Sequence, residues 1–396
     1  MNQKHLTLAL FLNASILLFP SNFKFFPVAF LGLVVLKNYK QINWNYLVLM
    51  SIPYLIILLG VLHSSNLERA FSQIQTGASL FLYPLCFSMI PAKSLRKIKI
   101  NKINNAFIVS IFIFTAVVFL YYLIIKGESW VFLVHHYITL IDKLIYDKYQ
   151  IHSLYLALLL TISIILSLRM ATKTKNKYTI FLYVVNVFYC LSLLAIMNKR
   201  ASVILIIITS LLFLFTLNKK IKKVAILFAF GAIALLLGLV VYLPRFNGNS
   251  FLEFKKIEQS INDPKTSIGT RVVLNKATLE IFKSNPFFGV GSGDDREILS
   301  EFTAKLSDGV IKNYNSHNQF SSYLIKTGAF GLCVFLFYCC ILLKIALKSK
   351  DIVFICMFII FCGNMLIENI LEREAGVLVF SFFINYYSRI YYNEKR

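Results

Sequence analysis

The feature that most constrains the fold is a succession of apolar runs that recurs along almost the whole chain. A membrane-spanning helix needs about 20 mostly apolar residues, and many of these runs approach that length. Only 15% of the 396 residues are charged and 58% are hydrophobic, which leaves too little polar surface for a soluble protein of this size. We therefore expect an all-α polytopic membrane protein embedded in a lipid bilayer.

The runs predict about twelve spans, with boundaries set to within several residues. They lie near residues 6–20, 23–37, 44–63, 70–91, 104–126, 151–169, 178–198, 201–217, 223–243, 319–345, 351–370 and 374–392. The first two are short, and a single re-entrant hairpin is an alternative for them. The predicted organisation is thus about nine transmembrane helices in residues 1–243, a loop at 244–318 and about three helices in 319–396.

The net charge of +23 is distributed in a way that predicts the orientation of the chain. Every second link between apolar runs is basic, and such links are typical of cytoplasmic loops. Both termini are then cytoplasmic and the 244–318 loop lies outside. That loop has ten basic and nine acidic residues and is nearly neutral. The basic excess therefore indicates cytoplasmic anchoring, and we expect no nucleic-acid partner.

The 244–318 loop is the one long polar segment, and a loop of this length is usually functional. Apolar residues recur at helical spacing from Arg271 to Phe282, which predicts an amphipathic helix that ends at Asn285-Pro286. The pattern Gly289-x-Gly291-x-Gly293 is similar to a phosphate loop. No strand precedes it and no Gly-Lys-Ser/Thr follows, so we interpret it as a tight turn.

Three residues of the predicted outer face are candidates for catalysis: Arg200, Arg271 and His317. Two guanidinium groups suit a diphosphate, because each stays charged and donates a fork of hydrogen bonds to phosphate oxygens. His317 is the natural proton acceptor near neutral pH. Asn318 beside it can orient a sugar hydroxyl. Spacing alone does not establish that these groups meet, and scattered surface residues are the alternative.

Other polar residues have both a functional and a structural interpretation. Lys199 lies with Arg200 between two apolar runs, where the pair either meets an anion or reaches water at the interface. His152 stands at the outer start of a span and either binds substrate or makes a structural hydrogen bond. Charged residues at 368–374 predict an ion-pair cluster, with structure favoured over catalysis. No residues have metal-ligand spacing, and no disulfide framework or cofactor is indicated.

At these positions the chain resembles the O-antigen ligase / O-antigen polymerase family of bacterial envelope glycosyltransferases. The resemblance covers roughly residues 150–335, and the order and spacing of its short motifs carry it. The motifs are Asn198-Lys199-Arg200-Ala201-Ser202, Gly269-Thr270-Arg271, Asn285-Pro286-Phe287-Phe288-Gly289-Val290-Gly291-Ser292-Gly293, Ser316-His317-Asn318-Gln319-Phe320 and Lys326-Thr327-Gly328-Ala329-Phe330-Gly331.

The resemblance implies a protein of the bacterial inner membrane whose active site faces the periplasm in the loop between the ninth and tenth spans. It also implies a donor glycan linked through diphosphate to undecaprenol. Family arginines at the positions of Arg200 and Arg271 hold the diphosphate, and the histidine at the position of His317 activates the acceptor hydroxyl. Lys199, Thr270, Asn318 and His152 are the expected substrate-binding residues. The family often has serine where this chain has Lys199, which leaves the role of Lys199 open.

The expected reaction is a metal-independent, inverting transfer of the glycan to a sugar hydroxyl, with no nucleotide required. The acceptor stays open: lipid A-core for a ligase, another glycan or glycolipid for a polymerase, or a protein serine for a protein O-oligosaccharyltransferase. The alternative from another class is a lipid-linked oligosaccharide flippase or transporter. A transporter predicts ionisable residues along a path through the membrane, and the spans have few.

Overall fold

The computed structural model describes residues 2–142, 146–149, 151–197, 199–216 and 261–392. Over these residues the regular elements are all helical and no strand occurs, as expected from the sequence. The predicted span at 223–243 and the first part of the predicted loop lie outside the described residues.

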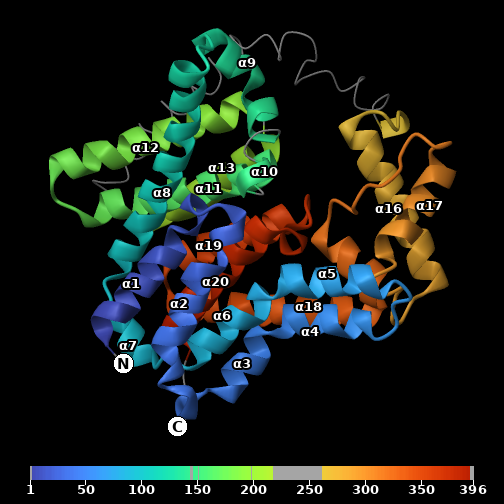
Figure 1. The fold of residues 1–396 in the computed structure, drawn as a ribbon, viewed down its shortest axis with the longest axis horizontal. Coiled ribbons are helices and arrows are strands. Elements are labelled where there is room, and N and C mark those ends of the chain that lie inside the picture. The colour runs from blue at the N-terminus through green and yellow to red at the C-terminus, as the bar shows by residue number, and fades with distance from the viewer. Residues whose placement is uncertain (1, 143–145, 150, 198, 217–260, 393–396) are drawn as a thin grey trace.

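The longer helices follow the apolar runs, and polar links separate them (Figure 1). In the first half of the chain they are α1 (Gln3–Ala14), α2 (Phe25–Leu36), α3 (Trp44–Met50), α4 (Ile52–Val61), α5 (Leu67–Gly77), α6 (Ser79–Ser88), α7 (Ala92–Arg96), α8 (Ile100–Leu120), α9 (Trp130–Leu140), α10 (Tyr146–Tyr149), α11 (Ser153–Lys173) and α12 (Lys177–Ile196). The remaining helices are α13 (Arg200–Phe215), α16 (Ser267–Ser284), α17 (Asp295–Leu306), α18 (Gln319–Ser349), α19 (Ile352–Met365) and α20 (Glu374–Tyr391).

Two helices form the interior. All residues of α20 from Ala375 to Ile390 are buried, and α20 packs against α6, α18 and α19. Most of α11 is also buried, between α8, α12, α13 and α19. Helices with apolar residues on all sides are expected either inside a protein or in lipid. Here α20 and α11 are inside, while α8 and α12 expose many large apolar side chains, which suits contact with lipid.

The predicted count of twelve spans is not confirmed. By length and composition four described helices can cross a membrane: Ile100–Ile125, Ser153–Lys173, Lys177–Ile196 and Gln319–Ser349. A fifth is added if α3 and α4, bent by 61° at Ser51, form one span. Some other predicted spans are divided into shorter helices. The predicted span at 70–91, for example, is divided at Ala78 into α5 and α6.

The amphipathic helix expected in the loop is present as α16 (Figure 1). It begins four residues earlier than predicted, because the Thr266 side chain accepts a hydrogen bond from the Gly269 amide and caps the helix. Leu274, Ala277 and Ile281 are buried in a small apolar cluster that includes residues of α17 and α18. The helix ends at Asn285, where it was expected to end.

The segment after α16 packs into a break in α18. Gly328 has φ 61° and ψ −159°, which interrupts the helix and frees backbone groups on both sides. The Val290 amide donates to the Ile325 carbonyl (2.8 Å), and the Ala329 amide donates to the Pro286 carbonyl (2.8 Å). Because these bonds replace the lost helical ones, the loop and the broken helix stabilise each other.

The glycines of the segment serve this close approach rather than phosphate binding. Gly289 has φ 69°, and a Cβ atom there would overlap the carbonyl oxygen of Ile325. Beyond it, the segment is bonded to the link between α4 and α5. The Ser292 amide donates to the Gly60 carbonyl (2.9 Å), and the Asp294 carboxylate accepts from the amides that follow Ser64. The tight-turn interpretation of the glycines is therefore confirmed.

Replacing Gly328 by alanine is expected to lower the free energy of unfolding by about 1–3 kcal/mol, because its backbone conformation is essentially restricted to glycine. An added Cβ would also overlap the Phe287 carbonyl carbon. Thermal unfolding in detergent measures the loss. Gly127→Ala is the matched control, since Gly127 shares a positive φ (64°) but has open space around it. An equal loss of stability in both variants would show that the overlap of the added Cβ with Phe287 does not contribute to the loss.

Candidate active site

His317 lies on the turn that leads into α18. Its backbone has φ 46°, a left-handed conformation in which histidine is enriched over most residues. The turn is fixed because the Asn318 side chain accepts hydrogen bonds from the amides of Phe320 and Ser321 and so caps α18. The Asn318 amide in turn donates to the side-chain oxygen of Asn369 (2.8 Å).

The His317 side chain is held by Glu368, which lies in the link between α19 and α20. Nδ1 of His317 is 3.0 Å from Oε2 of Glu368, and the exposed fractions of the two side chains are 27% and 8%. A carboxylate can only accept, so this contact places a proton on Nδ1 and leaves the lone pair on Nε2. His317 is thus a half-buried imidazole whose orientation and tautomer are both set by a neighbour.

Glu368 is charged at neutral pH. Burial acts to raise its pKa, but hydrogen bonds from His317 and from Asn315 (3.2 Å) outweigh burial and lower the pKa from its ordinary value of 4.5. A charged carboxylate behind the ring also stabilises the imidazolium that forms when His317 takes up a proton. The pair therefore has the arrangement of a general base and its positioning residue.

His152 caps α11 through its ring, because Nδ1 accepts from a backbone amide of the first turn at 3.4 Å. Its Nε2 is 3.5 Å from Oδ2 of Asp142. Burial lowers the pKa of His152, Lys199 and Arg373 lower it further, and Asp142 and Glu368 act in the opposite direction. The structural interpretation of His152 is therefore supported, and its ring also lies within electrostatic reach of the His317–Glu368 pair.

Lys199 lies immediately before α13 and belongs to the same region. Burial lowers the pKa of its ammonium group, while the carboxylates of Asp142 and Glu368 raise it. Glu368, the partner of His317, thus acts electrostatically on both Lys199 and His152. That these residues share one substrate site stays a prediction.

The structure gives less information on the two candidate arginines. Arg200 begins α13 directly after Lys199, and its side chain lies outside the described part of the structure. Arg271 lies near the start of α16, is partly buried, and makes no hydrogen bond or ion pair with a described residue. The hydroxyl of Thr270 donates to the Thr266 carbonyl (2.8 Å). That Arg200, Arg271 and His317 converge stays a prediction.

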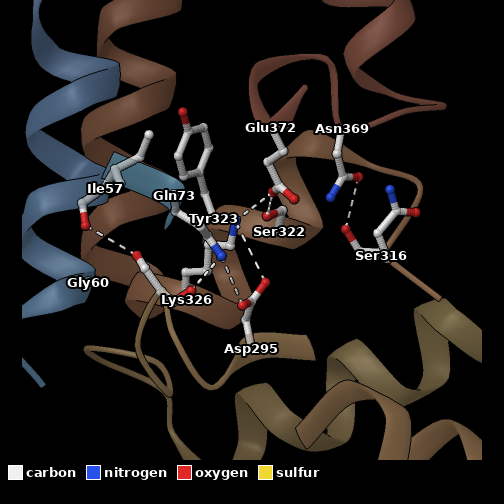
Figure 2. A network of polar contacts seen from close by, with 12 residues as sticks. Ile57, Gly60, Gln73, Asp295, Ser316, Ser322, Tyr323, Lys326, Asn369 and Glu372 are labelled. Carbon is white, nitrogen blue, oxygen red and sulfur yellow. Dashed lines mark hydrogen bonds and ion pairs between the residues drawn. The ribbon is translucent and has the colours of Figure 1, made fainter. Parts of the chain in front are cut away.

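A second polar cluster lies beside the pair, at the place where α17 meets α18 (Figure 2). Nζ of Lys326 is 2.7 Å from Oε1 of Glu372 and 3.6 Å from Oδ2 of Asp295, and its side chain is only 3% exposed. Ser322 donates to the same Glu372 oxygen. Arg69 of α5 approaches Asp295 from the other side, with Nη2 3.0 Å from Oδ1.

The two carboxylates of this cluster differ in electrostatic environment. Burial acts to raise the pKa of Glu372, but the Lys326 charge and several hydrogen bonds lower it below its usual value. For Asp295 burial is the stronger effect, so its pKa is raised despite Lys326 and Arg69. The charged residues at 368–374, which were expected to form one cluster, therefore contribute to two separate groups of contacts. Glu368 holds His317, and Glu372 holds Lys326.

Glu368 and Lys326 are the functional candidates that the sequence did not assign. Glu368 was placed in a charged cluster without a partner, because 51 residues separate it from His317. Lys326 stands out in the sequence only as the first residue of the motif that ends at Gly331. A charged residue within an apolar run is the signal that points to it, since such residues are rare unless paired.

Part of this region matches a known sequence family. Residues 185–336 match the family model described as O-antigen ligase, which confirms the resemblance found in the motifs. A search of curated proteins found no match. The matched stretch contains Lys199, Arg200, Arg271 and His317 and ends before Glu368.

Proposed function

We propose that the protein is a membrane glycosyltransferase of the ligase or polymerase type, because residues 185–336 match the family model described as O-antigen ligase. In this proposal it moves an oligosaccharide from undecaprenyl diphosphate to a sugar hydroxyl of an acceptor. The observation that carries the proposal beyond the family is the His317–Glu368 pair, with Nδ1 and Oε2 3.0 Å apart at a half-buried position.

His317 is the proposed general base. Its Nε2 takes the proton of the acceptor hydroxyl as the oxygen attacks the anomeric carbon of the donor sugar. Glu368 holds the ring and stabilises the imidazolium. Proton transfer of this kind contributes about 10²–10⁴-fold to a rate. The bond from the anomeric carbon to the diphosphate oxygen breaks, and undecaprenyl diphosphate leaves with the bonding electrons.

Arg200 and Arg271 are the proposed ligands of the donor diphosphate, as the family resemblance implies. Negative charge grows on the bridging oxygen during the reaction, and fixed guanidinium groups stabilise that charge most effectively where water is excluded. Lys199 supports this role, because its partly buried ammonium group lies next to Arg200 in sequence. The single displacement inverts the anomeric centre. A product with retained configuration would contradict this scheme.

The test uses purified full-length protein in lipid nanodiscs with undecaprenyl-diphosphate-linked repeat units. A ladder of longer glycans with no other acceptor identifies a polymerase. Transfer that appears only after lipid A-core is added identifies a ligase. Transfer to a serine peptide identifies a protein O-oligosaccharyltransferase. If no acceptor is glycosylated while the lipid-linked glycan crosses the bilayer of proteoliposomes, the protein is a transporter.

Replacing Glu368 by glutamine is expected to lower the maximal transfer rate about 10–100-fold, the size typical of losing a group that orients a functional histidine. The amide still accepts from Nδ1 but no longer stabilises an imidazolium, so kcat should fall while KM stays nearly unchanged. Folding lowers the pKa of Glu368, so its carboxylate stabilises the folded protein above about pH 4.5. This contribution is lost as the pH falls through the lowered pKa.

Separate measurement of kcat and KM distinguishes positioning from simple structural support. Glu301→Gln, at an exposed position on α17, is the matched control and should leave both constants unchanged. A Glu368→Gln variant that unfolds more easily and loses as much in KM as in kcat would mean that Glu368 only supports the fold.

A further inference from the structure

A cavity of about 200 Å³ opens beside the Lys326 cluster, and we call it the arginine pocket. It lies between α5, the start of α17, α18 and the link that precedes α20. Arg69, Arg296, Arg373, Lys326 and Glu372 line it together with uncharged residues. Pockets for drug-sized ligands are usually about 300–1,000 Å³, so this volume suits a small group rather than a sugar chain.

The pocket has more positive than negative charge. Four of its lining residues are cationic and one, Glu372, is acidic. Asp295 does not line the pocket, but its carboxylate contacts two lining residues, Lys326 and Arg69. These four cations and two carboxylates together leave a net charge of +2.

The two parts of the cluster therefore differ in what they can bind. Lys326 is only 3% exposed and lies between Glu372 and Asp295, so its charge is neutralised within the protein. Arg296 and Arg373 line the pocket with exposed side chains, and Arg69 is half-buried and paired with Asp295. Burial lowers the pKa of Arg69, Asp295 at 3.0 Å acts in the opposite direction, and the charge of Arg296 lowers it again. An anion between Arg69 and Arg296 would offset the repulsion between these two guanidinium groups.

The pocket and the proposed active site are built from the same two parts of the chain. Gln319, Tyr323 and Lys326 line it from one face of α18, at spacings of four and three residues, and Gln319 is two residues from His317. The link before α20 contributes to both places: it presents Glu368 to His317 and Arg373 to the pocket. The charge of Arg373 also acts on His152, which lies within reach of Glu368.

From this arrangement we propose that the arginine pocket binds a phosphate or diphosphate group of a glycolipid substrate, with Arg69, Arg296 and Arg373 as its ligands. Guanidinium groups suit this chemistry, because each donates two parallel hydrogen bonds to phosphate oxygens. The proposal rests on the proposed glycosyl transfer for the identity of the substrate, and the bound group belongs to the donor or to a phosphorylated acceptor. It adds ligands that the family motifs do not contain.

The experiment measures binding without transfer. Full-length protein in nanodiscs is titrated with inorganic pyrophosphate at constant ionic strength, and thermal unfolding reports the binding. We expect stabilisation of the wild type. Arg296→Gln and Arg373→Gln should each bind pyrophosphate at least about tenfold more weakly, since a hydrogen bond to a charged group is lost. Lys276→Gln is the control, because it removes an exposed cation from the outer face of α16.

Undecaprenyl diphosphate is the second probe, and it distinguishes the two sources of the phosphate. If both arginine variants also weaken binding of this lipid, the pocket holds the donor. If they weaken only pyrophosphate binding, it holds a phosphorylated acceptor. An unstabilised wild type, or arginine variants that bind pyrophosphate like Lys276→Gln, would overturn the proposal. Pyrophosphate bound through the arginines without glycosyl transfer would reject the proposed function alone.

Discussion

Replacement of His317 by alanine is expected to lower the transfer rate by about 10²–10⁴-fold, the contribution of a positioned general base. Nε2 is the only ring nitrogen available to the acceptor hydroxyl, because Nδ1 is 3.0 Å from Glu368. Turnover of lipid-linked repeat units with a saturating acceptor measures the effect.

Two further variants separate loss of the base from loss of the fold. His317→Asn retains a side chain that tolerates the left-handed backbone and can still donate to Glu368, but it has no basic nitrogen. It should unfold like the wild type and yet be as inactive as His317→Ala. His5→Ala changes an exposed histidine of α1 and should be fully active. If His317→Asn keeps more than a tenth of the wild-type rate, His317 is not the base.

The largest effect on stability is expected from replacement of Lys326 by methionine. Glu372 and Asp295 both contact its ammonium group, at 2.7 and 3.6 Å, and all three side chains are at most 17% exposed. Removing one partner of a buried ion pair typically costs about 3–5 kcal/mol, because the remaining charge is left buried without compensation. Thermal unfolding in detergent at neutral pH, without added ligand, measures the loss.

The double variant Lys326→Met/Glu372→Gln tests the cause of this loss. If the uncompensated carboxylate is responsible, removing it should restore a large part of the stability, since neutral replacement of a whole buried pair is often tolerated. Lys344→Met, at an exposed position on the same helix, should have little effect. A double variant less stable than Lys326→Met would instead mean that Glu372 stabilises the fold through its other contacts, such as Ser322.

Part of the candidate site could be predicted from sequence because the relevant signals are local. The helical spacing of apolar residues from Arg271 to Phe282 predicted α16, and the pattern of glycines after Pro286 predicted a tight turn. The short motif around His317 was sufficient to single out that residue. Each of these features depends on residues within one or two helical turns of one another.

The partners in the site could not be predicted, because they are distant in sequence. Glu368 is 51 residues from His317, and Asp295 is far from Arg69, so only packing of α17, α18 and the link before α20 brings them into contact. The number of spans could not be predicted reliably from the sequence either. Ser51 and Ala78 separate shorter helices inside the predicted spans at 44–63 and 70–91.

The sequence by itself determined an all-helical membrane protein with a polar segment that contains the candidate base, because apolar periodicity and local motifs are properties of neighbouring residues. The tertiary structure alone decided which charges meet. A buried cation or carboxylate must find an opposite charge or a hydrogen bond wherever the chain provides one. For His317, Lys326 and Arg69 those partners come from other helices and links.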